Sequence, residues 1–237
     1  MILRVRSAKI AAFREEQCME ITLPKRNNIK ETTAADPLKF YYLPVARSFY
    51  TARFADAIRL LGKRVGRLLE VGCGSGIFLP ELAKHCDSLF ACDYHSSLVL
   101  TAEMLRYESV PAALARADAR TLPYASESMD AIICMSVLEH LHDLESPAEE
   151  FFRILRPGGI TIVGVPVANL MTEAMLRLSY LSLNAHLDDE HVSTHRDVLG
   201  TFSRKFLAEE VRKIPRVLPE QVSMYSTVRF RKQTTSH

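Results

Sequence analysis

Residues 67–76 read RLLEVGCGSG, and this stretch decides the fold class. Its first five residues form a short apolar run that ends in glycines, which indicates a buried strand. Gly72, Gly74 and Gly76 then let the backbone turn tightly and approach a ligand without intervening Cβ atoms. A helical pattern over residues 77–86 follows, and its first turn would point unpaired N–H groups at the same ligand. The stretch predicts a strand, a ligand-binding glycine loop and a helix, with a purely structural turn as the alternative.

Strands and helices alternate along the rest of the chain. The hydrophobic pattern predicts helices over 45–61, 96–107 and 146–155, and strands over 88–92, 112–117, 129–135 and 160–165. Such alternation is typical of βαβ units, whose right-handed crossovers place helices on both faces of a parallel sheet. We therefore expect an α/β fold with a doubly wound sheet, in which ligands bind beyond the carboxyl ends of the strands.

The two ends of the chain are harder to assign. Residues 1–44 are predicted to be an N-terminal extension, and residues 45–237 the main domain. Residues 166–195 form an insertion that is either a lid over a substrate pocket or a helix that packs on the core. The pattern predicts a helix over 202–214 and at least one strand over 222–230.

Composition excludes several classes of protein. The chain has 30 basic and 28 acidic residues and a net charge of +2, which gives no sign of a nucleic-acid binder. Its five cysteines include no CxxC pair, so neither a disulfide framework nor a zinc knuckle is expected. The sequence shows no signal peptide pattern and no apolar run long enough for a transmembrane helix. We expect a cytoplasmic protein.

Acidic residues follow two of the predicted strands. Asp93 comes directly after the strand 88–92, where a carboxylate can accept hydrogen bonds from both hydroxyls of a ribose, or can cap the next helix. Asp118 and Ala119 follow the strand 112–117. There a carboxylate can accept from an adenine amino group and a backbone N–H can donate to a ring nitrogen, or the aspartate simply faces water.

Together these residues resemble the class I S-adenosylmethionine-dependent methyltransferases, in particular the small-molecule group that includes the ubiquinone-biosynthesis O-methyltransferases. The resemblance runs from about residue 68 to residue 166 and rests on LLEVGCGSG, Asp93, the pair Asp118–Ala119, MDAIICMSVLEHL and RILRPGG. It implies a Rossmann-like sheet of seven strands, mostly parallel with an antiparallel last strand. It also implies transfer of a methyl group from S-adenosyl-L-methionine to a small-molecule acceptor, with S-adenosyl-L-homocysteine as the product.

The same resemblance assigns roles to individual residues. Glu70 would anchor the glycine loop or the methionine amino group, and Met135 would lie against the cofactor. Asp93 would hold the ribose, and Asp118 with Ala119 would meet the adenine. The complete predicted cofactor-binding set is Glu70, Gly72, Cys73, Gly74, Asp93, Tyr94, Asp118, Ala119 and Met135.

Two other functions remain open at this point. A nicotinamide dehydrogenase would prefer the pattern GxGxxG, but Ile77 stands where its last glycine belongs. A non-catalytic or activating subunit of the same fold would bind S-adenosylmethionine and carry out no chemistry.

His140 is the first candidate for a general base, because it follows the strand 129–135 at the edge of the expected crevice. Glu139 could orient it, or the two residues could simply pack at the start of a helix. His142, His191 and His195 are weaker candidates. His191 and His195 could also line the pocket, lie in a solvated loop or bind a metal, but no HExxH motif is present and no metal site is expected.

Overall fold

The computed structural model describes residues 19–33, 36–167, 169, 191–215 and 222–233 of the chain. Within these ranges it contains the helices α2 (Pro44–Leu61), α3 (Leu79–Leu82), α4 (Leu98–Glu108), α5 (Glu145–Ile154) and α7 (His195–Lys205). The strands are β1 (Val65–Val71), β2 (Cys86–Asp93), β3 (Ala113–Arg116), β4 (Met129–Met135), β5 (Leu155–Pro166), β6 (Leu207–Ile214) and β7 (Tyr225–Arg231). Short 3-10 helices include η2 (Pro37–Tyr42) and η4 (Leu138–His140).

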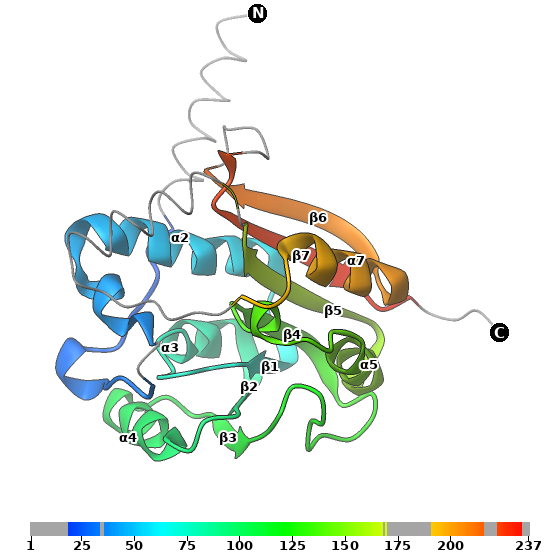
Figure 1. Ribbon diagram of the computed structural model, residues 1–237. Helices are drawn as coiled ribbons and strands as arrows, with labels where there is room; N and C mark the ends of the chain where they lie inside the picture. The colour runs from blue at the N-terminus through cyan, green and yellow to red at the C-terminus, as the bar shows by residue number, and fades with distance from the viewer. Residues whose placement is uncertain (1–18, 34–35, 168, 170–190, 216–221, 234–237) are drawn as a thin grey trace, which may run out of the picture.

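The strands form one seven-stranded sheet in the order β3-β2-β1-β4-β5-β7-β6 (Figure 1). The first five strands run parallel to one another, whereas β7 is antiparallel to both β5 and β6. The predicted doubly wound α/β sheet with an antiparallel last strand is therefore confirmed. Strand β4 has the predicted bounds, because its unbroken apolar sequence matches a strand that is buried on both faces.

Each face of the sheet carries its own hydrophobic cluster. Alternate residues of a strand point to opposite faces, so Leu68 of β1 packs under α2, α3 and α4, whereas its neighbour Leu69 packs under α5 and α7 (Figure 1). Along β4, Ile133 and Ile132 divide in the same way. Two covered faces explain why the central strands are continuously apolar.

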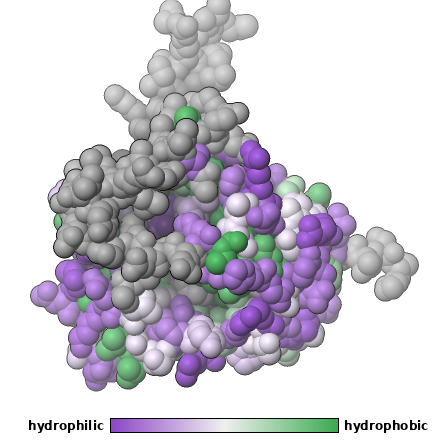
Figure 2. All heavy atoms as spheres, viewed as in Figure 1, coloured by the Kyte–Doolittle hydropathy of each residue, from purple (hydrophilic) through white to green (hydrophobic). Residues whose placement is uncertain are grey.

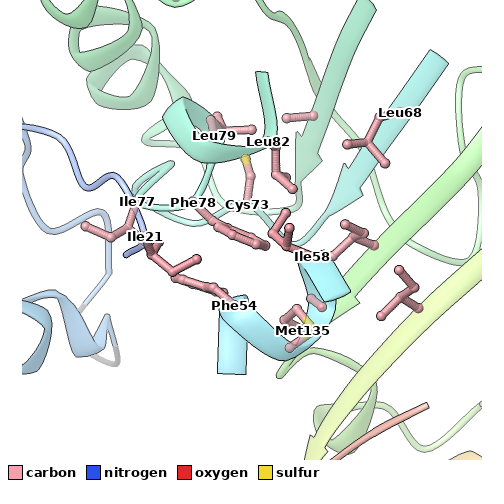
Figure 3. Packing of buried hydrophobic residues seen from close by; sticks show 14 of the residues in the cluster. Ile21, Phe54, Ile58, Leu68, Cys73, Ile77, Phe78, Leu79, Leu82 and Met135 are labelled. Carbon is pink, nitrogen blue, oxygen red and sulfur yellow. The ribbon is translucent and has the colours of Figure 1, made fainter. Parts of the chain in front are cut away.

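The described part of the N-terminal stretch packs on the main domain. Ile21, Ile29 and Leu38 are buried in the cluster that also contains Phe54 of α2. The ring of Phe54 stacks on Phe78 with a centroid distance of 3.8 Å (Figure 3). Residues 19–33 and 36–44 therefore contribute to the core, and η2 lines the same cleft as the glycine loop.

The helix predicted over 202–214 is wrong. Helix α7 ends at Lys205, and Leu207 begins the edge strand β6. Most of β6 is exposed, so its sequence lacks the alternation that a half-buried strand would show. Glu209 instead accepts hydrogen bonds from Arg229 and Arg231 of β7, and these charge pairs join the two strands. The true start of α7 is a capping box, in which Thr194 and Asp197 bond reciprocally.

Several other boundaries differ from the prediction, two of them near the glycine loop and at the start of β5. The helix predicted over 77–86 is shorter in the structure. It consists of α3 and one 3-10 turn, because β2 already begins at Cys86. Strand β5 begins at Leu155, five residues before the predicted start at residue 160, and includes Gly158 at a φ of +75°. Neither change moves a residue of the predicted site.

The described cysteines Cys73, Cys86, Cys92 and Cys134 are all buried free thiols. Among the described residues, no helix is both long enough and apolar enough to cross a membrane.

Candidate functional site

A cleft of about 1220 Å³ opens at the carboxyl ends of the parallel strands. The predicted cofactor-binding residues all line it, as do Glu139, His140 and His191. A hollow with hydrophilic surface inside it is visible on the face drawn in Figure 2. The structure thus brings together residues that lie up to 121 positions apart, between Glu70 and His191.

Hydrogen bonds hold the glycine loop against the carboxyl end of β2. The backbone N–H groups of Gly72 and Cys73 both donate to the carbonyl of Cys92, at 2.8 and 3.1 Å. The N–H of Gly74 donates to Oδ2 of Asp93 at 2.7 Å. Gly72 and Gly74 have φ values of +80° and +50°, a region that favours glycine. The loop therefore holds a fixed shape beside the cleft.

We expect Gly72→Ala to destabilise the protein. A Cβ at this position would lie 2.0 Å from Cγ2 of Val137, in addition to the strain of a positive φ, which alone costs roughly 1–3 kcal/mol. Chemical denaturation should show that the free energy of unfolding falls by at least this amount. Gly200→Ala is the matched control: it lies in α7 with no atom within 4 Å of the added Cβ, so it should be neutral or stabilising by about 0.5–1 kcal/mol. Equal stability of both variants would mean that the loop relaxes.

Glu70 is a buried carboxyl at the floor of the cleft, with 4% of its surface exposed. Its Oε2 atom has no hydrogen-bond partner among the described residues. Burial, together with the nearby charge of Asp93, raises the pKa of Glu70 well above its usual range. A cation placed in the cleft would supply the missing partner and favour the ionised form.

Asp93 both anchors the glycine loop and faces the cleft. Its Oδ2 accepts from Gly74, and its Oδ1 accepts from the backbone N–H of His95 at 3.2 Å. A carboxylate offers about four lone-pair positions, so acceptor capacity remains for a ligand. Its neighbour Tyr94 is 68% exposed at the rim. Helix α4 begins at Leu98, where no side-chain cap is formed, so Asp93 does not cap it.

Asp118 follows β3, the strand beside β2, and is paired with Arg120. Two guanidinium nitrogens of Arg120 donate to its carboxylate, at 3.0 and 2.6 Å, and the hydrogen bond from this side chain lowers the pKa of Asp118. Asp118 is thus held ionised beside the cleft. Ala119 follows it and is nearly buried at 9% exposure.

Met135 ends β4 and packs against Gly164 of the neighbouring strand as well as lining the cleft. Figure 3 shows its side chain beside Ile58 and Phe54 of α2. The next residue, Ser136, has a left-handed φ of +57° and forms hydrogen bonds that the sequence did not predict. It contacts Arg53 of α2 and Tyr225 of β7.

This second end of the cleft was missed by sequence reasoning. Its walls come from η2, α2 and the segment before β7, and they include Tyr41, Tyr50, Arg53 and Met224. No local motif marks these residues, because the contact between Arg53 and Ser136 spans 83 positions.

His140, Glu139 and His191 form a cluster on the third side of the cleft. Their potential ligand atoms all lie within 4.8 Å of one another, and the rings of the two histidines are 5.2 Å apart. Glu139 is buried, whereas both histidines are exposed. The cluster could place a general base, and its donor set could also hold a divalent metal ion. His142 lies outside the residues that line the cleft, and His195 begins α7.

Residues 168 and 170–190, which include most of the expected lid, lie outside the described residues. The described residues Pro166, Val167 and Asn169 at its start line the cleft.

Comparison with known proteins agrees with this arrangement. The sequence profile of a family described as "Methyltransferase domain" matches residues 69–163. A probable S-adenosylmethionine-dependent methyltransferase of Mycolicibacterium smegmatis is 33% identical over 109 residues, which are 46% of this chain and 41% of that protein. A ubiquinone biosynthesis O-methyltransferase of Psychrobacter cryohalolentis is 29% identical over 114 residues, covering 44% of this chain and 41% of that protein. The similarity thus spans about two fifths of these relatives.

Solved structures show the same fold over most of the chain. The N-methyltransferase NodS from Bradyrhizobium japonicum, in complex with S-adenosyl-L-homocysteine, superposes with a TM-score of 0.61 at 21% identity. The superposition covers 84% of this chain and 93% of NodS. The sheet order and the motifs agree with the matched profile, so residues 69–163 of this chain are similar to methyltransferase domains.

Proposed function

We propose that this chain transfers a methyl group from S-adenosylmethionine to a small-molecule acceptor. The observation that carries the proposal is the buried, unpartnered Oε2 of Glu70 beside a glycine loop that is fastened to Asp93. A cleft of this size can hold a nucleoside cofactor and a second small molecule.

The residues present fit S-adenosylmethionine. Glu70 offers a carboxylate to an amino group, and Asp93 retains lone pairs for ribose hydroxyls. An added Cβ at Gly74 would meet no atom within 4 Å, so this glycine opens directly into space that a ligand can fill. Asp118 and Ala119 line the same cleft after the neighbouring strand β3, where they would bind the adenine.

The bound cofactor supplies a methyl group made electrophilic by its sulfonium. The chain's task is to hold an acceptor atom in line with that methyl group and to exclude water, which requires shape more than strong acids or bases. Where the acceptor is a hydroxyl, His140 would take its proton, and Glu139 would orient the imidazole. The buried free thiols support the expected reducing, cytoplasmic compartment.

Calorimetric titration with S-adenosylhomocysteine should show one site per chain and release of up to one proton from Glu70. The proton leaves because Glu70 is protonated in the free protein at pH values below its raised pKa, and a bound ammonium group favours the carboxylate. The release is measured at mildly acidic pH, by comparing heats in buffers of different ionisation enthalpy.

Glu70→Gln should abolish the proton release and weaken binding, whereas Glu149→Gln, an exposed change on α5, should alter neither. Tight binding of NADH with no binding of S-adenosylhomocysteine would contradict the proposal. Normal cofactor binding without methylation of any acceptor in a labelled-cofactor screen would favour the alternative, a non-catalytic subunit of the same fold.

A further inference from the structure

Strand β6 forms one edge of the seven-stranded sheet (Figure 1). It has eight residues, Leu207–Ile214, and no described strand lies on its outer side. At the opposite edge, β3 has only four residues. An edge strand presents N–H and C=O groups that a further strand can bond, and a short edge strand offers few of them. The longer edge, β6, is therefore the one at which another chain could extend the sheet.

Two large apolar side chains of this edge strand are exposed. Leu207 is 48% exposed and Val211 is 50% exposed. Because Val211 lies opposite Val228 of β7, it points to the face of the sheet that α5 and α7 cover, but it is not part of the hydrophobic cluster on that face. A strand placed beside β6 would remove the exposed half of Val211 from water.

The charged residues on either side of Val211 have opposite signs. Glu210 precedes it and Arg212 follows it, and their side chains are 3.0 Å apart on the other face of the strand. In an antiparallel pair of two β6 strands centred on Val211, Glu210 of each copy would lie opposite Arg212 of the other copy. A pair centred on Glu210 or on Arg212 would instead place like charges opposite each other, which is destabilising. The charge pattern thus favours one register and a second copy of the same strand.

A β-bulge between Ala208 and Glu210 interrupts the pairing of β6 with β7. Bulges twist a strand locally and disturb regular pairing. We therefore expect a short ladder around Val211, and a dimer that exchanges with the monomer and does not need to form for the chain to fold.

We propose that two copies of this chain associate through antiparallel pairing of their β6 strands, with Val211 at the two-fold axis. The two seven-stranded sheets would then form one continuous sheet. An isologous contact of this kind closes after two copies, so it gives a dimer and not a fibre. The association is independent of the proposed methyl transfer, because it involves no residue of the cleft and needs no bound cofactor.

The first measurement is sedimentation of the full chain over about 1 to about 200 µM, where the mass should rise from that of the monomer toward that of the dimer. Val211→Lys would place two ammonium groups opposite each other at the axis, and we expect it to weaken the association by about tenfold or more. Val99→Lys is the matched control, because Val99 is 64% exposed on α4, and it should associate like the wild type. Equal melting temperatures would show that both variants are folded.

A cross-linking experiment tests the register. Residues directly opposite in an antiparallel pair have Cα atoms about 4.5–5.5 Å apart, within the range of about 4.4–6.8 Å that a disulfide spans. Mild oxidation of Val211→Cys should therefore give a covalent dimer, seen by electrophoresis without reductant. Leu207→Cys is the control on the same strand, because its two thiols would lie about 27 Å apart along the paired strands. The wild type, whose described cysteines are buried, gives the background.

The proposal is overturned if the wild type is a monomer at every concentration, and the charges of β6 would then serve to keep this edge unpaired. It is also overturned if Val211→Lys associates as tightly as Val99→Lys. A dimer in which Val211→Cys cross-links no faster than Leu207→Cys would use a different surface or register and would equally contradict the assignment.

Discussion

Replacing His140 by alanine should lower the rate of methyl transfer to a hydroxyl acceptor by about 10² to 10⁴, the usual contribution of a positioned general base. The affinity for S-adenosylhomocysteine should barely change, because His140 groups with Glu139 and His191 and is not one of the predicted cofactor-binding residues. The measurement is turnover of labelled cofactor with an acceptor found by screening, beside calorimetry on the same variant.

The geometry supports this expectation. His140 follows β4 within the 3-10 helix η4, and its backbone N–H donates to Val137 at 3.1 Å, which fixes the start of the turn. The carboxyl of Glu139 lies within 4.8 Å of the imidazole. The backbone carbonyl of Glu139 also accepts from Val192 and Ser193, and these bonds hold His191 against the cluster.

His142→Ala serves as the control, because this histidine is exposed and lies outside the cleft, and it should retain full activity. Treatment with EDTA distinguishes a general base from a metal site at the cluster of Glu139, His140 and His191. A general base is insensitive to the chelator, whereas activity that is lost with EDTA and restored by a divalent ion would reassign Glu139, His140 and His191 to a metal site. Full activity of His140→Ala would show that positioning alone, or another residue, carries the reaction.

The cofactor half of the cleft could be predicted from the sequence because its residues follow strands. In a parallel sheet the carboxyl ends of neighbouring strands meet, so a residue's place after its strand gives its place in the site. Glu70, Asp93 and Met135 lie at the carboxyl ends of β1, β2 and β4, and Asp118 lies two residues after β3. The structure places all four on one cleft. Their roles in binding remain predictions.

The end of the cleft around Arg53 could not be predicted, because its residues come from segments without a repeating pattern. Arg53 lies on the predicted helix 45–61, but the residues that define its surroundings are Tyr41, Ser136 and Tyr225, which are distant in sequence. Only the pairing of β7 with β5 brings Tyr225 to this place, opposite Pro166. A charge in an aromatic pocket is a tertiary feature that composition and periodicity do not reveal.

Replacing Asp93 should weaken the binding of S-adenosylhomocysteine by roughly tenfold to a few hundredfold, since each hydrogen bond from a ribose hydroxyl to a carboxylate contributes about 1.5–3 kcal/mol. The structure gives Asp93 a second task, because its Oδ2 accepts from Gly74 at 2.7 Å. Asp93→Ala would therefore remove both the ribose acceptors and the anchor of the loop. We expect it to lower the melting temperature as well as the affinity.

Asp93→Asn separates these two tasks. The amide oxygen can still accept from Gly74, but the amide nitrogen can accept neither from a ribose hydroxyl nor from the His95 N–H. The melting temperature should therefore fall less than in Asp93→Ala, while the affinity falls. Asp87→Ala is the control on the same strand, because Asp87 is exposed and pairs with Arg64 at 2.8 Å, away from the cleft. Unchanged affinity in a folded Asp93→Asn protein would restrict Asp93 to anchoring the glycine loop. A loss of affinity at unchanged melting temperature would assign it directly to the ligand, because the loop would then be intact.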